Sequence, residues 1–159
     1  MPFLGIVADD LTGATTPGVL LARSSAKTAV FFDQKQLEKT DTAAMDAVII
    51  STGSRALSAR QAYGRVAAAA QVLKERGVTC FSKRIDTTLR GQLGAEIDAM
   101  LDTLGGDWVA VVVPAMPQSR RIVVGGYSLI DGVPLSETFA ARDVLTPVHE
   151  SFVPWLLQS

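Results

Sequence analysis

The chain has 159 residues, of which 48% are hydrophobic and 19% charged, a composition typical of a globular domain with a real core. Its 15 basic and 16 acidic residues give a formal net charge of -1, and no basic run occurs, so a nucleic-acid-binding surface is not expected. Cys80 is the only cysteine and His149 the only histidine. This excludes an intramolecular disulfide and argues against a structural zinc or His-rich metal site.

No segment of the sequence has the pattern of a membrane anchor or of a secretion signal. Residues 1–7 lack the basic lead and the apolar length of a signal peptide. The most apolar later run, residues 108–113, is far shorter than the roughly 18 residues that a membrane span needs. We therefore expect a cytoplasmic protein that does not bind membranes.

Short apolar runs typical of strands alternate with longer amphipathic runs typical of helices. Strands are predicted at residues 3–8, 28–32, 47–51, 78–82 and 108–113, the last one covered on both faces because its hydrophobicity is unbroken. Helices are predicted from Thr12 to about Arg23, from a Ser58–Gln61 capping box to Gly77, and from Leu89 to Leu104. The alternation predicts an α/β fold with three layers, in which helices flank a mainly parallel sheet.

The last part of the chain changes character after Pro114. Residues 122–124 and 127–130 are predicted as short strands, Asp131-Gly132 as a turn, and residues 152–157 as a helical turn. We interpret this part as a short β-hairpin extension near the C-terminal end of a single domain that spans residues 1–159.

Polar clusters follow four of the predicted strands. They comprise Asp9 and Asp10, then Ser54 and Arg55, then Lys83, Arg84, Asp86 and Arg90, and finally residues 114–121. Ligands of parallel sheets bind beyond the carboxyl ends of the strands, so these clusters predict one site at one edge of the sheet.

Each cluster also has a purely structural interpretation. In the Asp9-Asp10 turn, adjacent side chains point opposite ways, so one carboxylate is placed to face a ligand and the other to cap the next helix. The turn alone does not separate that arrangement from two capping or solvent-facing residues. Lys83 and Arg90 suit an anionic ligand, whereas Asp86 could equally cap a helix and pair with Arg90 in a solvated loop.

These clusters together resemble the N-terminal domain of the four-carbon acid sugar kinase family. The resemblance covers nearly the whole chain, through residues 6–14, Ser54-Arg55, residues 83–96, residues 114–117, Arg121 and the hairpin at residues 126–137. It implies phosphorylation of erythronate- or threonate-type sugar acids at the terminal hydroxyl, with ATP and Mg2+. It also implies a separate C-terminal domain that binds ATP, and we expect that domain to lie outside this chain. We expect this chain alone to hold no metal ion.

The resemblance assigns roles to residues of this sequence. It implies that the acid pocket is lined by Asp9, Asp10, Ser54, Arg55, Lys83, Asp86 and Arg90, with Arg121 as an addition. Our own mechanism hypothesis makes Asp9 and Asp10 the catalytic residues and the others substrate-binding residues, together with Thr12. Arg55, Arg90 or Lys83 would hold the substrate carboxylate. Two positions depart from the family pattern, Thr16 in place of an aspartate and Arg120 in place of a glycine, and both bear on substrate and activity.

Two other classes of function are compatible with the same residues. One is a stand-alone sugar-acid-binding or regulatory module that never meets ATP, and the other is a truncated remnant without a function of its own. No Walker or Gly-x-Gly-x-x-Gly motif occurs, so kinase activity of this chain alone is not expected. The sequence is compatible with a homo-oligomer but does not specify one.

Overall fold

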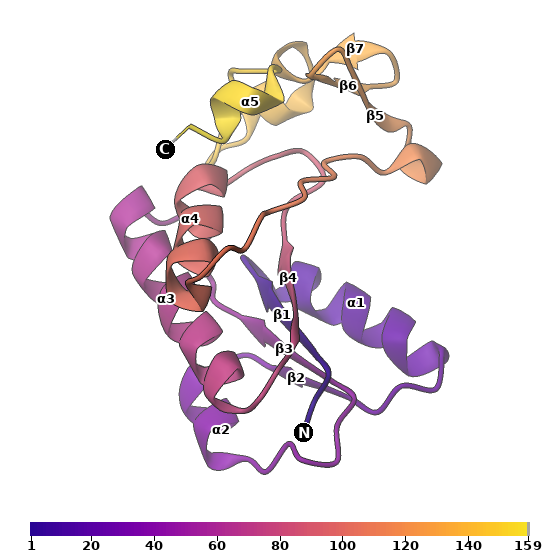
Figure 1. Ribbon diagram of the computed structural model, residues 1–159. Helices are drawn as coiled ribbons and strands as arrows, with labels where there is room; N and C mark the ends of the chain where they lie inside the picture. Colours follow the sequence, from indigo (N-terminus) through magenta and orange to yellow (C-terminus); the bar gives the residue numbers. More distant parts are fainter. Residues whose placement is uncertain (159) are drawn as a thin grey trace.

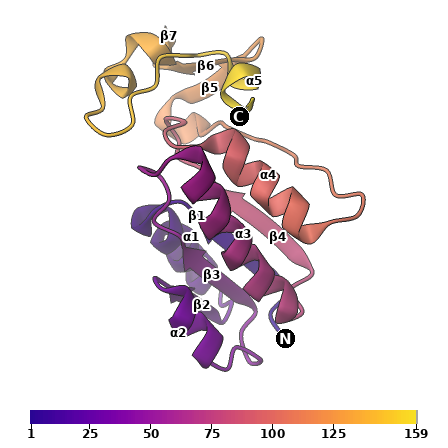
Figure 2. The same cartoon turned by 90° about the vertical axis from the view of Figure 1, so that its left-hand side faces the viewer.

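Four parallel strands form the central sheet of the computed structural model, which describes residues 1–158. The strands β1 (Leu4–Ala8), β2 (Thr28–Phe31), β3 (Ala47–Ser51) and β4 (Cys80–Arg84) lie in the order β2-β3-β1-β4. Helix α1 (Leu11–Arg23) packs on one face, and α2 (Gln34–Lys39), α3 (Ala59–Glu75) and α4 (Leu93–Leu104) lie over the other (Figures 1 and 2). The predicted α/β fold with a mainly parallel sheet is confirmed, while α2 was not predicted.

The two faces of the sheet bury different apolar clusters. Val7, Val48 and Ile50 point toward α3 and α4 and belong to the larger cluster, in which Val66 and Leu73 of α3 are also fully buried. On the opposite face, a smaller cluster packs under α1 and consists of Ile6, Ala8, Ala14 and Ile49. Successive side chains of each strand thus point to opposite faces, and both faces of the sheet are covered by helices.

Local signals in the sequence explain where the first helices begin and end. Asp10 is the N-cap of α1 and accepts a hydrogen bond from the Gly13 amide. Gln61 folds back on Ser58 at the start of α3, as the capping box predicts. Gly77 follows the end of α3 with a φ of 78°, which a glycine adopts without strain.

The C-terminal part of the chain forms a small module beyond the carboxyl end of β4 (Figure 1). Its antiparallel sheet contains β5 (Arg121–Val124), β6 (Tyr127–Ile130) and β7 (Val133–Pro134), and it is followed by α5 (Val153–Leu156). Leu89 and Leu93 join it to the parallel sheet by packing in one buried cluster with its apolar residues, Ile130, Leu135, Ala140, Val148 and Val153. The predicted hairpin and the helical turn are confirmed. None of the helices among residues 1–158 is long and apolar enough to cross a bilayer.

Two predicted boundaries around β4 are shifted in the structure. β4 begins at Cys80 and ends at Arg84, because its ladder with β1 pairs Leu4 with Cys80 and Ala8 with Arg84. Helix α4 begins at Leu93 rather than at Leu89, whose φ of 56° is incompatible with a right-handed helix. Lys83 and Arg84 therefore lie inside a strand, with side chains on opposite faces of the sheet.

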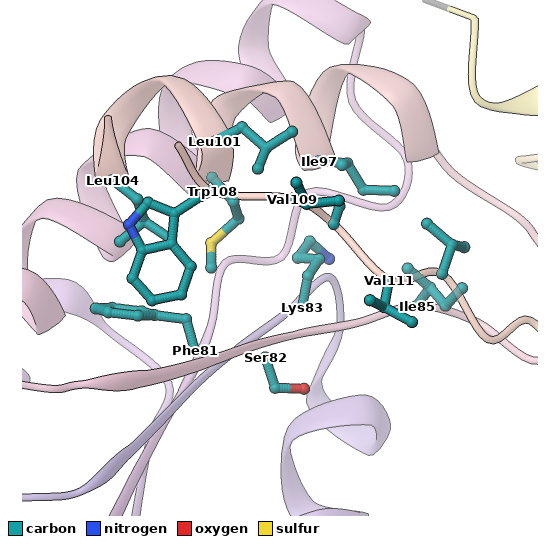
Figure 3. Close-up of a pocket in the computed structure, with 13 residues that line it drawn as sticks. Phe81, Ser82, Lys83, Ile85, Ile97, Leu101, Leu104, Trp108, Val109 and Val111 are labelled. Atoms are coloured by element: carbon teal, nitrogen blue, oxygen red, sulfur yellow. The ribbon is translucent and has the colours of Figure 1, made fainter. Parts of the chain in front are cut away.

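The predicted fifth strand at residues 108–113 is wrong. This segment has no regular secondary structure and forms no ladder with any strand of the described chain, and Val109, Val111 and Val113 are 81%, 86% and 72% exposed. Trp108 and Val109 line a cavity of about 330 Å³ together with residues of α4 and β4. Figure 3 shows their side chains among those around this cavity. Apolar residues alone predict burial, but a strand also needs a neighbour that accepts its backbone hydrogen bonds.

Candidate functional site

Asp9 and Arg55 form the centre of a charged cluster at the carboxyl ends of β1 and β3. Asp9 is only 2% exposed, and Arg55 donates to its two carboxylate oxygens from Nε at 2.7 Å and from Nη2 at 3.2 Å. The backbone amides of Ser54 and Arg55 also donate to the Asp9 carbonyl, at 2.9 and 3.3 Å. The loop after β3 is thus fixed to the end of β1, and the bidentate pair sets the direction of the Arg55 guanidinium.

Asp10 has different surroundings from those of its neighbour. One of its oxygens accepts from the Gly13 amide at 2.6 Å, and the other lies 2.5 Å from Arg55 Nη1. Its side chain is 27% exposed, whereas that of Asp9 is 3% exposed. The structure therefore separates a buried, fully bonded carboxylate from a capping carboxylate that reaches solvent.

Asp86 and Arg90 continue the cluster from the end of β4. Arg90 Nε donates to Asp86 at 2.6 Å, and Arg90 Nη1 donates to Asp143 of the C-terminal module at 2.8 Å. Asp86 also accepts from the Thr88 hydroxyl at 2.5 Å and lies 3.9 Å from Arg55 Nη2. The Asp86–Arg90 pair that the sequence allowed is therefore present, and it connects the two halves of the cluster.

Four charged residues of this network have shifted pKa values, and each shift favours the charged form: Arg55, Asp86, Arg90 and Asp143. Burial opposes ionisation of Asp86, but hydrogen bonds from Arg90 and Thr88 and the charge of Arg55 outweigh it, so its pKa lies below the ordinary value. The hydrogen bond that Arg90 donates to Asp86 raises the pKa of Arg90. Burial alone would lower this pKa, and the hydrogen bond to Asp143 raises it further. Burial would lower the pKa of Arg55, but Asp9, Asp86 and Asp10 together raise it. The amide of Thr146 and the guanidinium of Arg90 lower the pKa of Asp143.

Asp143→Asn is expected to lower the melting temperature of the chain near neutral pH and to have little effect in acid. A free aspartate titrates near pH 3.9, and the pKa of Asp143 is lower than that in the folded chain. The stability contributed by the ionised carboxylate is therefore complete above about pH 4 and is lost as the pH falls toward the folded-state value. Thermal unfolding of both proteins between about pH 2 and pH 8 measures this, and the difference should shrink steadily below about pH 4. A difference that stays constant throughout would contradict it.

A cavity of about 370 Å³ opens beside this cluster. The residues that line it come from the ends of β1, β3 and β4, from the first turns of α1, and from Met116: they are Asp10, Thr12, Gly13, Thr16, Arg55, Arg84, Ile85, Asp86, Thr87, Arg90 and Met116. Of the residues predicted from the sequence, Asp10, Thr12, Arg55, Asp86 and Arg90 thus meet at one cavity, at the edge of the sheet where ligands of parallel sheets bind.

Lys83 and Ser54 lie on the other side of the sheet, against α4. The ammonium of Lys83 is 2.8 Å from Glu96 Oε2 and donates to the Arg84 carbonyl at 2.9 Å. Glu96 is 1% exposed, and its other oxygen accepts from the fully buried Ser54 hydroxyl. Lys83 lines the cavity between α4 and residues 108–112 (Figure 3), not the one beside Asp10. A substrate-binding role for both residues stays a prediction.

The remaining predicted residues lie at the border of the site. Thr16 is exposed on α1 and lines the cavity one turn after Thr12. Arg121 begins β5, pairs by its backbone with Met116, and has a buried Nε without a hydrogen-bond partner among the described residues. Arg120 has a φ of 54°, a conformation that favours glycine, which is the residue the family pattern has there.

Three residues of the site were not predicted from the sequence. Asp143 is 53 positions from its partner Arg90, and no periodicity or motif connects the two. Glu96 lies within the region of family resemblance, but a glutamate in the first turn of a helix is usually solvated. Arg84 was included in a polar cluster without a role. Because β4 extends to Arg84, the alternation of side chains along the strand places it opposite Lys83, on the face of the cavity beside α1.

Comparisons with known proteins identify the family of this chain. Residues 4–159 match the family model of the sugar-binding N-terminal domain. A D-erythronate kinase of Heliobacterium modesticaldum is 53% identical over 93% of this chain and 34% of its own length. A D-threonate kinase of Bordetella bronchiseptica is 39% identical over 98% of this chain and 39% of its own length.

A solved structure gives the same result for the fold. It is a domain of unknown function from Bordetella bronchiseptica, crystallised with bound citrate as a domain-swapped dimer, and it superimposes with a TM-score of 0.92 at 38% identity. The match covers 98% of this chain and 39% of that one. The chain thus spans between a third and two fifths of the length of these relatives. It belongs to the family of sugar-binding N-terminal domains that is found in four-carbon acid sugar kinases.

Proposed function

We propose that this chain binds four-carbon sugar acids of the erythronate or threonate type and forms the substrate-binding part of an ATP-dependent kinase. The kinase would phosphorylate the terminal hydroxyl of the acid. The observation that carries this proposal is the cavity beside Asp10, which brings arginines and aspartates from three strand ends to one opening of about 370 Å³. Arginine suits a carboxylate, and aspartate oxygens accept hydrogen bonds from hydroxyls, so both groups of a sugar acid find partners.

The proposed chemistry depends on positioning and electrostatics. Phosphoryl transfer passes through a loose transition state that needs little covalent help, so the protein mainly has to orient the attacking hydroxyl. Asp10 lines the cavity and is placed to accept the proton of that hydroxyl. Asp9 does not line it and instead holds Arg55, so we assign Asp9 an orienting role.

ATP and Mg2+ belong to this proposal as partners that the C-terminal nucleotide-binding domain would hold. Among residues 1–158, no group of three or more His, Cys, Asp or Glu residues is placed to bind a metal ion. The carboxylates of the cavity, Asp10 and Asp86, already face arginines. In our proposal, Mg2+ therefore accompanies the nucleotide and neutralises the phosphate charge, and this chain contributes the acid site.

The setting of the protein is part of the same proposal. We place the kinase in the cytoplasm, as expected for a metabolic enzyme that consumes ATP. The related Bordetella structure is a domain-swapped dimer, and a homo-oligomer of this protein is compatible with the proposed site.

Addition of erythronate or threonate is expected to raise the melting temperature of the chain, whereas ATP with Mg2+ is expected to leave it unchanged. A ligand that binds only the folded state stabilises it by about 2.7 kcal/mol at a concentration one hundred times its Kd. Thermal unfolding with each acid, with a neutral four-carbon alditol as control, and with ATP measures this. Stabilisation by neither acid would contradict the proposed function. A shift with ATP alone would indicate a nucleotide site instead.

A further inference from the structure

Most basic side chains around the proposed sugar-acid site already have carboxylate partners. Arg55 contacts Asp9 and Asp10 within hydrogen-bond distance, and Arg90 contacts Asp86 and Asp143. Lys83 pairs with Glu96 on the opposite face of the sheet. A substrate carboxylate that bound Arg55 or Arg90 would have to share or displace an existing partner, and a displaced carboxylate would lose its neutralising charge.

Arg84 differs from these residues. It ends β4, is half-buried, and has no ion pair or side-chain hydrogen bond with any residue of the described chain. Its side chain runs over the start of α1, because Arg84 Cγ lies 3.5 Å from the point where a Cβ on Gly13 would be. This is an ordinary van der Waals distance, so the stem of Arg84 packs against the first turn of α1 next to Asp10.

Arg84 also lies where two cavities meet. It lines the cavity beside Asp10 and a second cavity of about 350 Å³ between α1 and residues 113–116. The two cavities share Thr16, residues 84–87 and Met116, so they adjoin along the side chains of these residues. An anion that enters from either side meets Arg84.

The charge of the cavity depends on this residue. Asp10 and Asp86 line it directly, and Asp9 and Asp143 bind the arginines from behind. Arg55 and Arg90 are outnumbered by these four aspartates, and Arg84 reduces that excess of negative charge, so a carboxylate in the cavity is favoured most next to Arg84. With Arg84, the cavity offers a planar fork of donors that no protein carboxylate occupies.

We propose that Arg84 is the residue that recognises the substrate carboxylate, and that Arg55 and Arg90 instead hold the aspartates that contact the hydroxyls. This inference rests on the proposed binding of sugar acids and names the residue that makes the site select acids. It differs from the expectation drawn from the sequence, in which Arg55, Arg90 or Lys83 holds the carboxylate. The geometry leaves Arg84 free for that role without breaking an internal ion pair.

The test measures the Kd of erythronate and threonate and of their neutral amides, which keep the shape of the acid without its charge. Wild type is expected to bind the acid more tightly than the amide. In Arg84→Gln, the Kd of the acid should rise about ten- to a hundredfold, while the Kd of the amide should change little. Arg84→Lys should keep part of the preference, because it retains the charge but not the fork. Arg23→Gln, which removes the same charge at the other end of α1, should behave as wild type.

The outcomes separate this inference from the proposed function. If wild type binds the acids and Arg84→Gln keeps the preference for them, the role of Arg84 is overturned and the proposed function stands. An equal loss for acid and amide would likewise overturn it, since the loss would then not concern the carboxylate. If wild type binds neither acid, the proposed function fails and the role of Arg84 with it. Melting temperatures without ligand should be equal for Arg84→Gln and wild type, because Arg84 makes no ion pair in the described chain.

Discussion

Lys83→Met is expected to lower the free energy of unfolding by about 3–5 kcal/mol, as found when one partner of a buried ion pair is removed. The side chain of Lys83 is 8% exposed and that of Glu96 is 1% exposed, so the substitution leaves a carboxylate without a counter-charge in the core. Methionine fills nearly the same volume, which limits the loss of packing. Urea unfolding followed by circular dichroism measures the effect.

A double variant separates the lost ion pair from other effects of Lys83→Met. When Glu96→Gln is added, the remaining amide still accepts from the Ser54 hydroxyl but carries no charge, so most of the lost stability should return. Lys35→Met on the exposed surface of α2 is the matched control and should change stability by no more than about 0.5 kcal/mol. If Lys83→Met unfolds like wild type but no longer binds sugar acids, Lys83 is a substrate ligand and not an anchor of the fold.

The sequence predicted the layers of the fold because each strand and helix carries its own local signal. β1 and β3 have unbroken apolar runs, and α3 has both a capping box and a terminal glycine. Residues 108–113 have the same apolar signal and yet form no strand in the described chain. Hydrophobicity reports the tendency to be buried, whereas strand formation depends on a hydrogen-bonding neighbour that the segment itself cannot reveal.

The sequence predicted where the candidate site lies, but not which of its charged residues contact one another. Asp10, Arg55 and Asp86 lie together because the parallel strands that precede them end at the same edge of the sheet. β4 extends to Arg84, two residues beyond its predicted end, so Lys83 and Arg84 lie within the strand and point to opposite faces of the sheet instead of sharing one loop. A strand boundary is among the least certain features of a sequence, so this arrangement could not be foreseen. Likewise, Asp143 reaches Arg90 only through the packing of a distant module.

Asp10→Asn is expected to lower kcat about 10²- to 10⁴-fold in the complete kinase that carries this chain, the range typical of losing a general base. Asparagine caps a helix about as well as aspartate does, so the bond from the Gly13 amide should persist and the fold should be kept. The measurement is the steady-state rate of ADP formation with erythronate or threonate, together with the Kd of the acid for the chain alone.

Asp33→Asn provides the matched control. Asp33 is the N-cap of α2 and accepts from the Lys35 amide, so the same substitution removes the same charge from the same kind of position, away from the cavity. Its kcat should equal that of wild type. An equal loss in both variants would assign the effect of Asp10→Asn to capping rather than to catalysis.

The relation between kcat and Kd then decides what Asp10 does. A fall in kcat with little change in Kd indicates a proton acceptor, whereas weaker binding at constant kcat indicates a ligand of a hydroxyl that does not react. No change in either would contradict any role in the reaction. Asp9 cannot replace it in that case, because Asp9 does not line the cavity and its side chain is only 3% exposed. A base that no substrate can reach orients other groups, so the proton would then have to leave through Asp86 or through a group of the nucleotide domain.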